Sequence, residues 1–163
     1  MRPANFAPVA GSAPLYGACR PGHFRTGLAA WTDLLETAGV SRVVCLLSET
    51  EARRWGIPDD YADRFEAHHV PILDRQLPSP DRLETAVSLV DEAIDDGERA
   101  AVHCNAGLGR TGVVAAGWLV RARGYEPDAA IDTVEAAGRS PREAVACDNA
   151  TEAELYALLE SSR

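Results

Sequence analysis

Residues 100–112 read AAVHCNAGLGRTG, and this stretch decides how the chain folds. Ala100 to His103 form a short run of small, branched and aromatic residues that is typical of a buried strand. The segment from Arg110 to Arg123 is mostly apolar on one side and is predicted to be a helix. A glycine-rich turn joins the two, and ligands of α/β proteins bind at such carboxyl ends of strands. We therefore expect a binding site between this strand and this helix.

The turn itself predicts an anion site. Gly107 and Gly109 allow the backbone to curl tightly, so that successive N–H groups can point into one cradle. The positive end of the following helix dipole lies behind that cradle, and a phosphate group fits such surroundings. The residues expected to line it are Asn105, Ala106, Gly107, Leu108, Gly109 and Arg110.

Cys104 stands at the mouth of the turn and is the candidate nucleophile. A thiol near several N–H dipoles, a helix N-terminus and an arginine ionises readily, and the thiolate is the nucleophilic form. Arg110 offers a planar fork for two phosphoryl oxygens. Thr111 can donate a hydrogen bond to the sulfur, and His103 is expected to orient the loop from the strand side. The structural alternatives are a buried core cysteine, a threonine that merely starts the helix, and a core histidine.

Two nucleotide-binding motifs compete for the same turn. Residues 107–112 match the G-x-G-x-x-G pattern of dinucleotide sites, which also requires a second strand ending in an acidic residue about 20 residues later. The predicted helix instead runs into residues 124–128 and then into more helix. The nucleoside-triphosphate loop requires a lysine, and this chain has none. Neither motif explains the turn.

Outward from this centre, short strands alternate with helices. Strands are predicted near residues 15–18, 42–47, 67–70 and 100–103. Helices are predicted over residues 26–37, 48–54, 79–97, 110–123, 127–137 and 149–160. Ser48 with Glu51 makes a capping-box signature, and Ser79 is an N-cap with Pro80 at the first helical position. This order predicts an α/β fold whose sheet pairing is at least partly parallel, with helices covering both faces. No repeat or linker interrupts it, so residues 1–163 are expected to form a single domain.

Composition narrows the class of protein. The 163 residues include 16 basic and 25 acidic side chains, a net charge of -9, which argues against a broad nucleic-acid or anionic-membrane surface. No apolar run approaches the ~18 residues of a membrane span, and the N-terminus lacks the apolar core of a signal peptide. We expect a cytoplasmic monomer. All basic residues are Arg and none is Lys, which indicates either GC-rich coding or, together with the acidic composition, adaptation to a salt-rich cytoplasm. The scattered cysteines, which indicate a reducing compartment, are Cys19, Cys45, Cys104 and Cys147.

The order His103-Cys104, five residues, Arg110-Thr111 resembles the signature of the cysteine-dependent protein tyrosine phosphatases. Residues 70–79, VPILDRQLPS, are similar to the small atypical dual-specificity phosphatases, in which an Asp on a mobile loop precedes a Pro-Ser helix start. The resemblance extends from about Asn5 through the last helix. It implies a central mixed sheet of four or five strands.

The resemblance also implies an activity. It points to a metal-independent phosphomonoesterase, a protein tyrosine or dual-specificity phosphatase, that uses a cysteinyl-phosphate intermediate and no cofactor. Asp74 becomes the candidate general acid, a role that contributes about 10²–10⁴-fold. A simple turn residue is the alternative for Asp74, and Asp81 is the other candidate acid. Leu73 stands where larger tyrosine phosphatases usually have Trp, which implies a shallow pocket for a phosphorylated protein or a small phosphomonoester.

Three points stay open from the sequence. The same chemistry could act on a nucleotide, an RNA 5′-phosphate or a sugar phosphate, or the chain could bind phosphate without turnover. Where many family members have Arg-Pro-Gly, residues 138–142 read GRSPR, so Arg139 or Arg142 is a candidate substrate contact. Cys45 is favoured as a core cysteine, with a disulfide to Cys104 under oxidation as the alternative.

No metal site is expected. His68 and His69 are adjacent on a predicted strand and therefore point to opposite faces, so both cannot easily hold one ion.

Overall fold

The computed structural model describes residues 2–163, and within them a five-stranded sheet has the order β1-β2-β5-β3-β4. β2, β5, β3 and β4 are parallel, whereas β1 pairs antiparallel with β2. The predicted mixed, partly parallel α/β sheet is confirmed. The strands are β1 (Ala7–Pro8), β2 (Leu15–Ala18), β3 (Val40–Cys45), β4 (Glu66–His69) and β5 (Arg99–His103).

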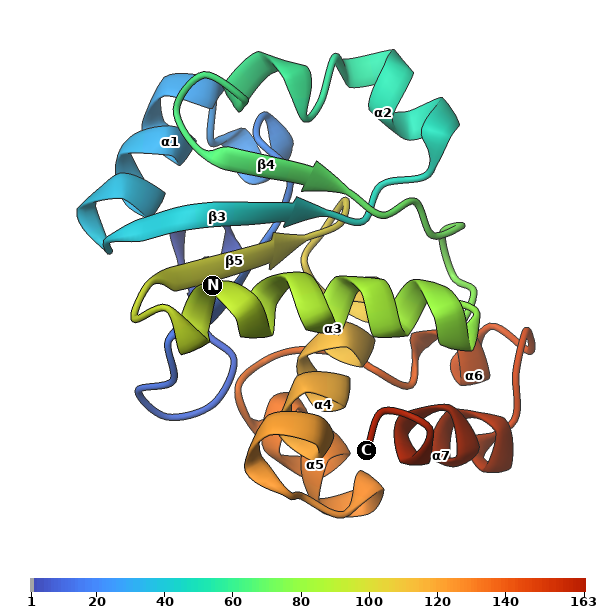
Figure 1. Cartoon of the computed structure of the whole chain (residues 1–163). Coiled ribbons are helices and arrows are strands. Elements are labelled where there is room, and N and C mark those ends of the chain that lie inside the picture. The colour runs from blue at the N-terminus through green and yellow to red at the C-terminus, as the bar shows by residue number, and fades with distance from the viewer. Residues whose placement is uncertain (1) are drawn as a thin grey trace.

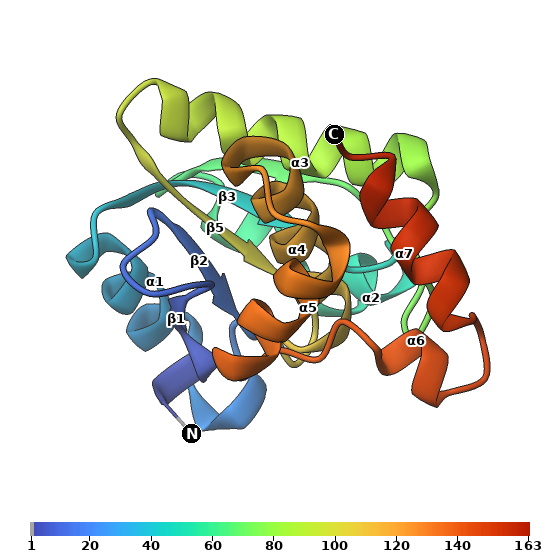
Figure 2. The same ribbon diagram turned by 90° about the horizontal axis from the view of Figure 1, so that it is seen from below.

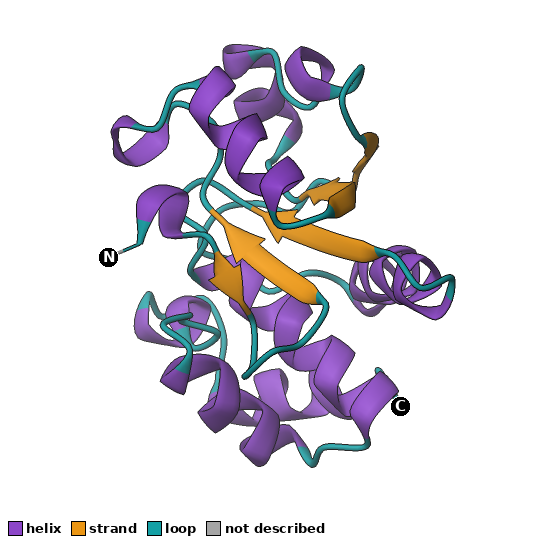
Figure 3. Cartoon of the chain, turned by 90° about the vertical axis from the view of Figure 1, so that its left-hand side faces the viewer, coloured by secondary structure: helices purple, strands orange, loops and turns teal. Residues whose placement is uncertain are grey.

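Helices cover both faces of this sheet. α1 and α2 lie on one side, and α3 to α7 lie on the other (Figure 1). Figure 3, with the strands in orange, shows the same two layers of helices around the sheet. The helices are α1 (Leu28–Thr37), α2 (Glu49–Trp55), α3 (Pro80–Asp95), α4 (Gly109–Arg123), α5 (Pro127–Ala136), α6 (Glu143–Ala146) and α7 (Glu152–Glu160), with 3-10 turns at Pro3–Asn5, His23–Arg25 and Asp59–Tyr61.

Each face of the sheet has its own apolar core. Trp31 and Tyr61 pack in the smaller core, under α1. The larger core surrounds α4, which is buried from Gly109 to Val120. A helix that is apolar on nearly all sides belongs in the interior, and α4 contacts α3, α5, α7 and the sheet (Figure 2). The N-terminus of α4 is therefore held rigidly near the carboxyl end of β5.

The predicted elements are found with their ends displaced by a few residues. The strand expected over residues 42–47 ends at Cys45. Leu46 and Leu47 remain buried although they leave the strand, so burial alone did not mark where strand pairing stops. β1 and α6 were not predicted, because pieces of 2 and 4 residues carry little periodicity.

The helices of the described chain are also too short or too polar for a membrane. None within residues 2–163 has both the length and the apolar character needed to cross a bilayer.

Candidate active site

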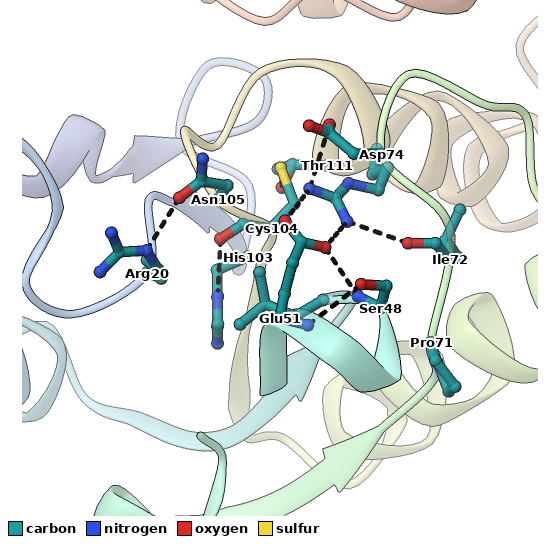
Figure 4. Close-up of polar contacts among 12 residues, drawn as sticks. Arg20, Ser48, Glu51, Pro71, Ile72, Asp74, His103, Cys104, Asn105 and Thr111 are labelled. Carbon is teal, nitrogen blue, oxygen red and sulfur yellow. Dashed lines mark hydrogen bonds and ion pairs between the residues drawn. The ribbon is translucent and has the colours of Figure 1, made fainter. Parts of the chain in front are cut away.

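Four parallel strands deliver the site residues to one edge of the sheet. Arg20 follows β2, Glu51 follows β3, Asp74 follows β4 and Cys104 follows β5. Because these strands point the same way, the segments after them meet at a single edge. Figure 4 shows the four side chains gathered around the loop between β5 and α4.

The carbonyl groups of this loop are held away from its centre. A trans peptide directs its N–H opposite to its C=O, so the N–H groups of residues 105–108 face inward. No acceptor among residues 2–163 engages these N–H groups, which leaves them free for an anion. The donors to the carbonyls are His103 Nδ1 to Cys104 at 3.0 Å, the Arg20 N–H to Asn105 at 2.9 Å, Asn5 Nδ2 to Ala106 at 3.0 Å and Arg139 Nη1 to Gly107 at 2.8 Å.

Gly107 is the residue that lets the loop turn. Its φ of 78° is in the left-handed region, which glycine adopts without strain. A Cβ at this position would stand 2.5 Å from the carbonyl oxygen of Ala18 and 2.8 Å from the backbone nitrogen of Cys19. The loop therefore packs directly on the end of β2.

Cys104 lies at the floor of the loop, before the N-terminus of α4. The residue is 3% exposed. Thr111 Oγ1 donates a hydrogen bond to Cys104 Sγ at 3.2 Å. The structure thus brings together the two residues that the sequence paired as nucleophile and hydroxyl donor.

The Arg110 guanidinium beside them is fixed by a carboxylate fork. Its Nη1 and Nη2 donate to Glu51 Oε1 and Oε2 at 2.6 and 3.1 Å, and Nη1 also donates to the Ile72 carbonyl at 2.9 Å. Asp74 Oδ1 lies 3.2 Å from Nη2. Burial opposes the charge, yet the hydrogen bonds that Arg110 donates to Glu51 and the nearby negative groups raise the pKa of Arg110.

Glu51 is a site residue that the sequence analysis missed in this role. Ser48-x-x-Glu51 was recognised as a capping box, and it forms: the Ser48 hydroxyl accepts from Glu51 N–H and Glu51 Oε1 accepts from Ser48 N–H at 2.9 Å. The same carboxylate also holds Arg110. Burial alone would raise the pKa of Glu51, but the hydrogen bonds from Arg110 and Ser48 lower it below its usual range. The local sequence predicted the helix cap, but nothing in it indicated that Glu51 would also bind Arg110, 59 residues away.

His103 is buried between the sheet and the smaller core. Because the Cys104 carbonyl can only accept, His103 Nδ1 carries the proton and Nε2 accepts from Tyr61 O–H at 2.7 Å. Burial lowers the pKa of His103 to about 4, so the ring is neutral near pH 7. His103 therefore contacts the loop backbone from behind.

The two candidate acids lie in different places. Asp74 sits in the turn between β4 and α3 and meets Arg110, whereas Asp81 is exposed in the first turn of α3. An unpredicted carboxyl, Glu143, packs against Gly109 at the start of α4. Burial and the nearby Asp74 raise the pKa of Glu143.

Both arginines of the GRSPR segment, the candidate substrate contacts, are engaged by groups of the protein itself. Arg142 pairs with Glu135 at 2.5 Å and with Glu152 at 2.7 Å, which ties α5 to α7. Arg139 is 3% exposed and holds the Gly107 carbonyl from outside the loop.

Cys45 and His69 lie outside the loop between β5 and α4. Cys45 packs in the smaller core and Cys104 in the larger one, and both thiols are free. Burial raises the pKa of Cys45 to about 12, which supports its interpretation as a core cysteine. His69 Nε2 contacts the Leu47 carbonyl at 2.7 Å. In the described chain no cluster of three or more His, Cys, Asp or Glu could hold a metal ion.

Comparison with protein families gives one match that covers most of the chain. The model described as "Polymorphic toxin system, DSP-PTPase phosphatase" matches residues 16–124. The Methanocaldococcus jannaschii protein MJECL20 is 32% identical over 73 residues, which cover 45% of this chain and 50% of that protein. Dual specificity protein phosphatase 2 of Mus musculus is 27% identical over 79 residues, or 48% of this chain and 25% of the mouse protein. These matches span half or less of either relative.

Solved structures show the same fold over nearly the whole chain. Kinase associated phosphatase, with its catalytic-site cysteine replaced by serine, has a TM-score of 0.75 at 20% identity and covers 98% of this chain and 93% of its own. Tk-PTP in its active form has a TM-score of 0.72 at 22% identity, with 99% and 97% coverage. PTPMT1 in complex with PI(5)P has a TM-score of 0.69 at 16% identity, with 96% coverage of both chains.

Proposed function

Because the chain belongs to the DSP-PTPase phosphatase family described for polymorphic toxin systems, we propose that it is a metal-independent phosphomonoesterase that forms a cysteinyl-phosphate on Cys104. The observation that carries this proposal is the position of Cys104 Sγ at the floor of a loop whose free N–H groups face inward. A nucleophile, anion donors and a cation then meet at one point, as phosphoryl transfer requires.

In the first step the Cys104 thiolate attacks the phosphorus and the bond from phosphorus to the leaving oxygen breaks. The developing charge falls on the equatorial oxygens, which the inward N–H groups and the Arg110 fork would hold. The fork would use Nε, which has no hydrogen-bond partner in the described residues, and Nη2 once Asp74 turns to the leaving oxygen. Glu51 keeps the plane of that fork fixed. Asp74, beside Arg110, would give its proton to the leaving oxygen, since an alkoxide or phenolate departs poorly.

In the second step water attacks the phosphorus and the P–S bond breaks. The Asp74 carboxylate would take a proton from this water, and the sulfur leaves as thiolate. The Thr111 hydroxyl, 3.2 Å from Sγ, stabilises that departing charge. The products are inorganic phosphate and the free enzyme. The proton that Asp74 gave to the leaving oxygen is thus replaced by one from water, and the enzyme returns to its starting state.

For the substrate we propose a phosphorylated protein, with phosphotyrosine and phosphoserine or phosphothreonine both accepted. Leu73, next to Asp74, is 68% exposed at the rim and offers an apolar contact to a leaving group. The loop residues Asn105, Ala106 and Leu108 are uncharged and add no cations for further phosphates, which disfavours polyphosphoinositides.

The test is hydrolysis of p-nitrophenyl phosphate in the presence of EDTA. We expect turnover that vanadate inhibits, and a phosphate adduct on Cys104 in acid-quenched protein. Cys104→Ser should abolish turnover and keep phosphate binding. Cys147→Ser, which changes an exposed free cysteine, is the matched control and should behave like the wild type.

Three results would contradict the proposal. Loss of turnover in EDTA would indicate that a metal takes part. Full activity of Cys104→Ser would show that Cys104 is not the nucleophile. Phosphate binding without turnover in the wild type would indicate a binding module.

A further inference from the structure

Arg139 is a buried charge that the proposed mechanism does not use. It follows α5 and is 3% exposed. Its guanidinium donates to backbone carbonyls: Nη1 to Gly107 at 2.8 Å, and Nη2 to Gly17 at 3.0 Å and Ala7 at 3.3 Å. Its Nε has no hydrogen-bond partner in the described residues.

A buried guanidinium without a counter-charge is unfavourable, so the structure should supply one. Burial lowers the pKa of Arg139 to about 10, and the charges that oppose this are those of Cys104 and Cys19. No carboxylate of residues 2–163 takes part in that balance. Cys104 and Cys19 are therefore the acidic groups whose ionised forms would favour this cation.

The other groups around Cys104 do not supply an unshared positive charge. The charge of Arg110 is already shared with Glu51 and Asp74. The remaining neighbours are neutral near pH 7, because burial raises the pKa of Cys19 to about 11 and of Cys45 to about 12 and lowers that of His103 to about 4.

The fold keeps room for this guanidinium beside Thr111. A Cβ on Gly17 would stand 2.7 Å from Arg139 Cζ and 2.9 Å from Thr111 Cγ2. Thr111 is the residue whose hydroxyl donates to Cys104 Sγ. Arg139 and Thr111, which donates a hydrogen bond to Cys104 Sγ, thus both pack against Gly17 of β2.

We propose that Arg139 is a positioning residue for the nucleophile, with two separable actions. Its fork holds the Gly107 carbonyl outward, which directs the Leu108 N–H into the cradle. Its unshared positive charge stabilises the Cys104 thiolate. The inference rests on the proposed function, because it concerns the same sulfur and the same loop.

Asn5 provides a matched comparison for the first action. Asn5 Nδ2 donates to the Ala106 carbonyl at 3.0 Å, so it braces the neighbouring peptide without carrying a charge. A variant of Asn5 tests loop bracing alone, whereas a variant of Arg139 tests bracing and charge together.

The experiment measures the rate at which iodoacetamide, a neutral reagent, alkylates Cys104 as a function of pH, in a Cys147→Ser background. In Arg139→Gln we expect the profile to move to higher pH, with about a tenfold or greater loss of rate on its acidic side. Asn5→Ala and the surface variant Arg121→Gln should leave the profile in place. Asn5→Ala should also weaken phosphate binding, and melting curves establish that each variant is folded.

Arg139→Lys separates the two actions and guards against misfolding. It keeps the charge and loses the fork, so its alkylation profile should match the wild type while phosphate binding weakens. An unshifted profile in folded Arg139→Gln, or an equal shift in Asn5→Ala, would overturn the charge stabilisation. If Arg139→Gln does not fold, Arg139→Lys decides: an unshifted profile with weakened phosphate binding supports the inference, whereas a shifted profile or unchanged phosphate binding rejects it. Failure of the proposed function itself would show separately, as a wild-type protein that does not hydrolyse p-nitrophenyl phosphate.

Discussion

Asp74 and Glu143 both bring a carboxyl group to the loop between β5 and α4, and their surroundings separate their roles. Asp74 meets Arg110 at 3.2 Å, so it would lie beside a bound phosphoryl group. Glu143 packs against Gly109 at the start of α4. Proximity to the arginine fork makes Asp74 the better placed acid.

Asp74→Asn should slow substrates with poor leaving groups far more than those with good ones. We expect a loss of about 10²–10⁴-fold for an alkyl phosphate and a much smaller loss for p-nitrophenyl phosphate, whose leaving group needs little protonation. Turnover of a series of esters measures this. Glu143→Gln is the control, with a similar change for every ester. If Glu143→Gln instead shows the dependence on leaving group, Glu143 is the acid.

His103 makes stability depend on pH. The folded-state pKa of about 4 lies below the ordinary value of 6.5, so its contribution is complete above pH 6.5 and is lost as the pH falls toward 4. Between about pH 7 and pH 5 this amounts to about 2 kcal/mol of unfolding free energy. Urea unfolding should show His103→Asn losing less stability over that interval than the wild type.

At the scale of elements, α2 positions two guanidiniums on opposite sides of the loop. Glu51 and Trp55 lie one turn apart on the same helix face. Glu51 holds Arg110, and Trp55 stacks under Arg20, whose Cζ is 3.7 Å from the ring centroid. Arg20 Nε in turn donates to Asn105 Oδ1 at 2.8 Å (Figure 4). A short helix with a strong N-cap thus fixes the rim of the site.

Glu51→Gln should therefore impair catalysis more than folding. The glutamine keeps a hydrogen-bond acceptor for Arg110 but loses the charge-assisted pair of hydrogen bonds. Because a hydrogen bond to a charged group contributes about 1.5–3 kcal/mol, we expect kcat/KM to fall about 10- to 100-fold. Glu49→Gln, at the first position of the same helix, is the matched control. Steady-state kinetics with melting curves measures both. Equal kcat/KM in the two variants would show that Glu51 only caps the helix.

At the scale of the whole molecule, the net charge of -9 makes like-charge repulsion the dominant surface term. Salt screens such repulsion, with a Debye length of about 10 Å at 0.1 M and about 3 Å at 1 M. We expect the melting temperature to rise from low salt to molar KCl. The rise should shrink near the pH where carboxylates begin to protonate. A melting temperature that does not rise would count against adaptation to a salt-rich cytoplasm.

The sequence by itself determined the features that depend on neighbouring residues. The turn after β5, the capping box at Ser48 and the Pro80 start of α3 were predicted, because each is specified by backbone geometry and hydrogen bonds within a few residues. The strand-helix alternation also sufficed for the parallel sheet.

Only the tertiary structure decided which distant side chains complete the site. Three contacts join segments that lie 59, 101 and 32 residues apart: Glu51 with Arg110, Asn5 with the Ala106 carbonyl, and Arg139 with the Gly107 carbonyl. No periodicity or local motif encodes such pairs, because they follow from strand order and from packing around α4. Two arginines of one short segment, Arg139 and Arg142, show the same limit: one is buried behind the loop and the other ties two outer helices.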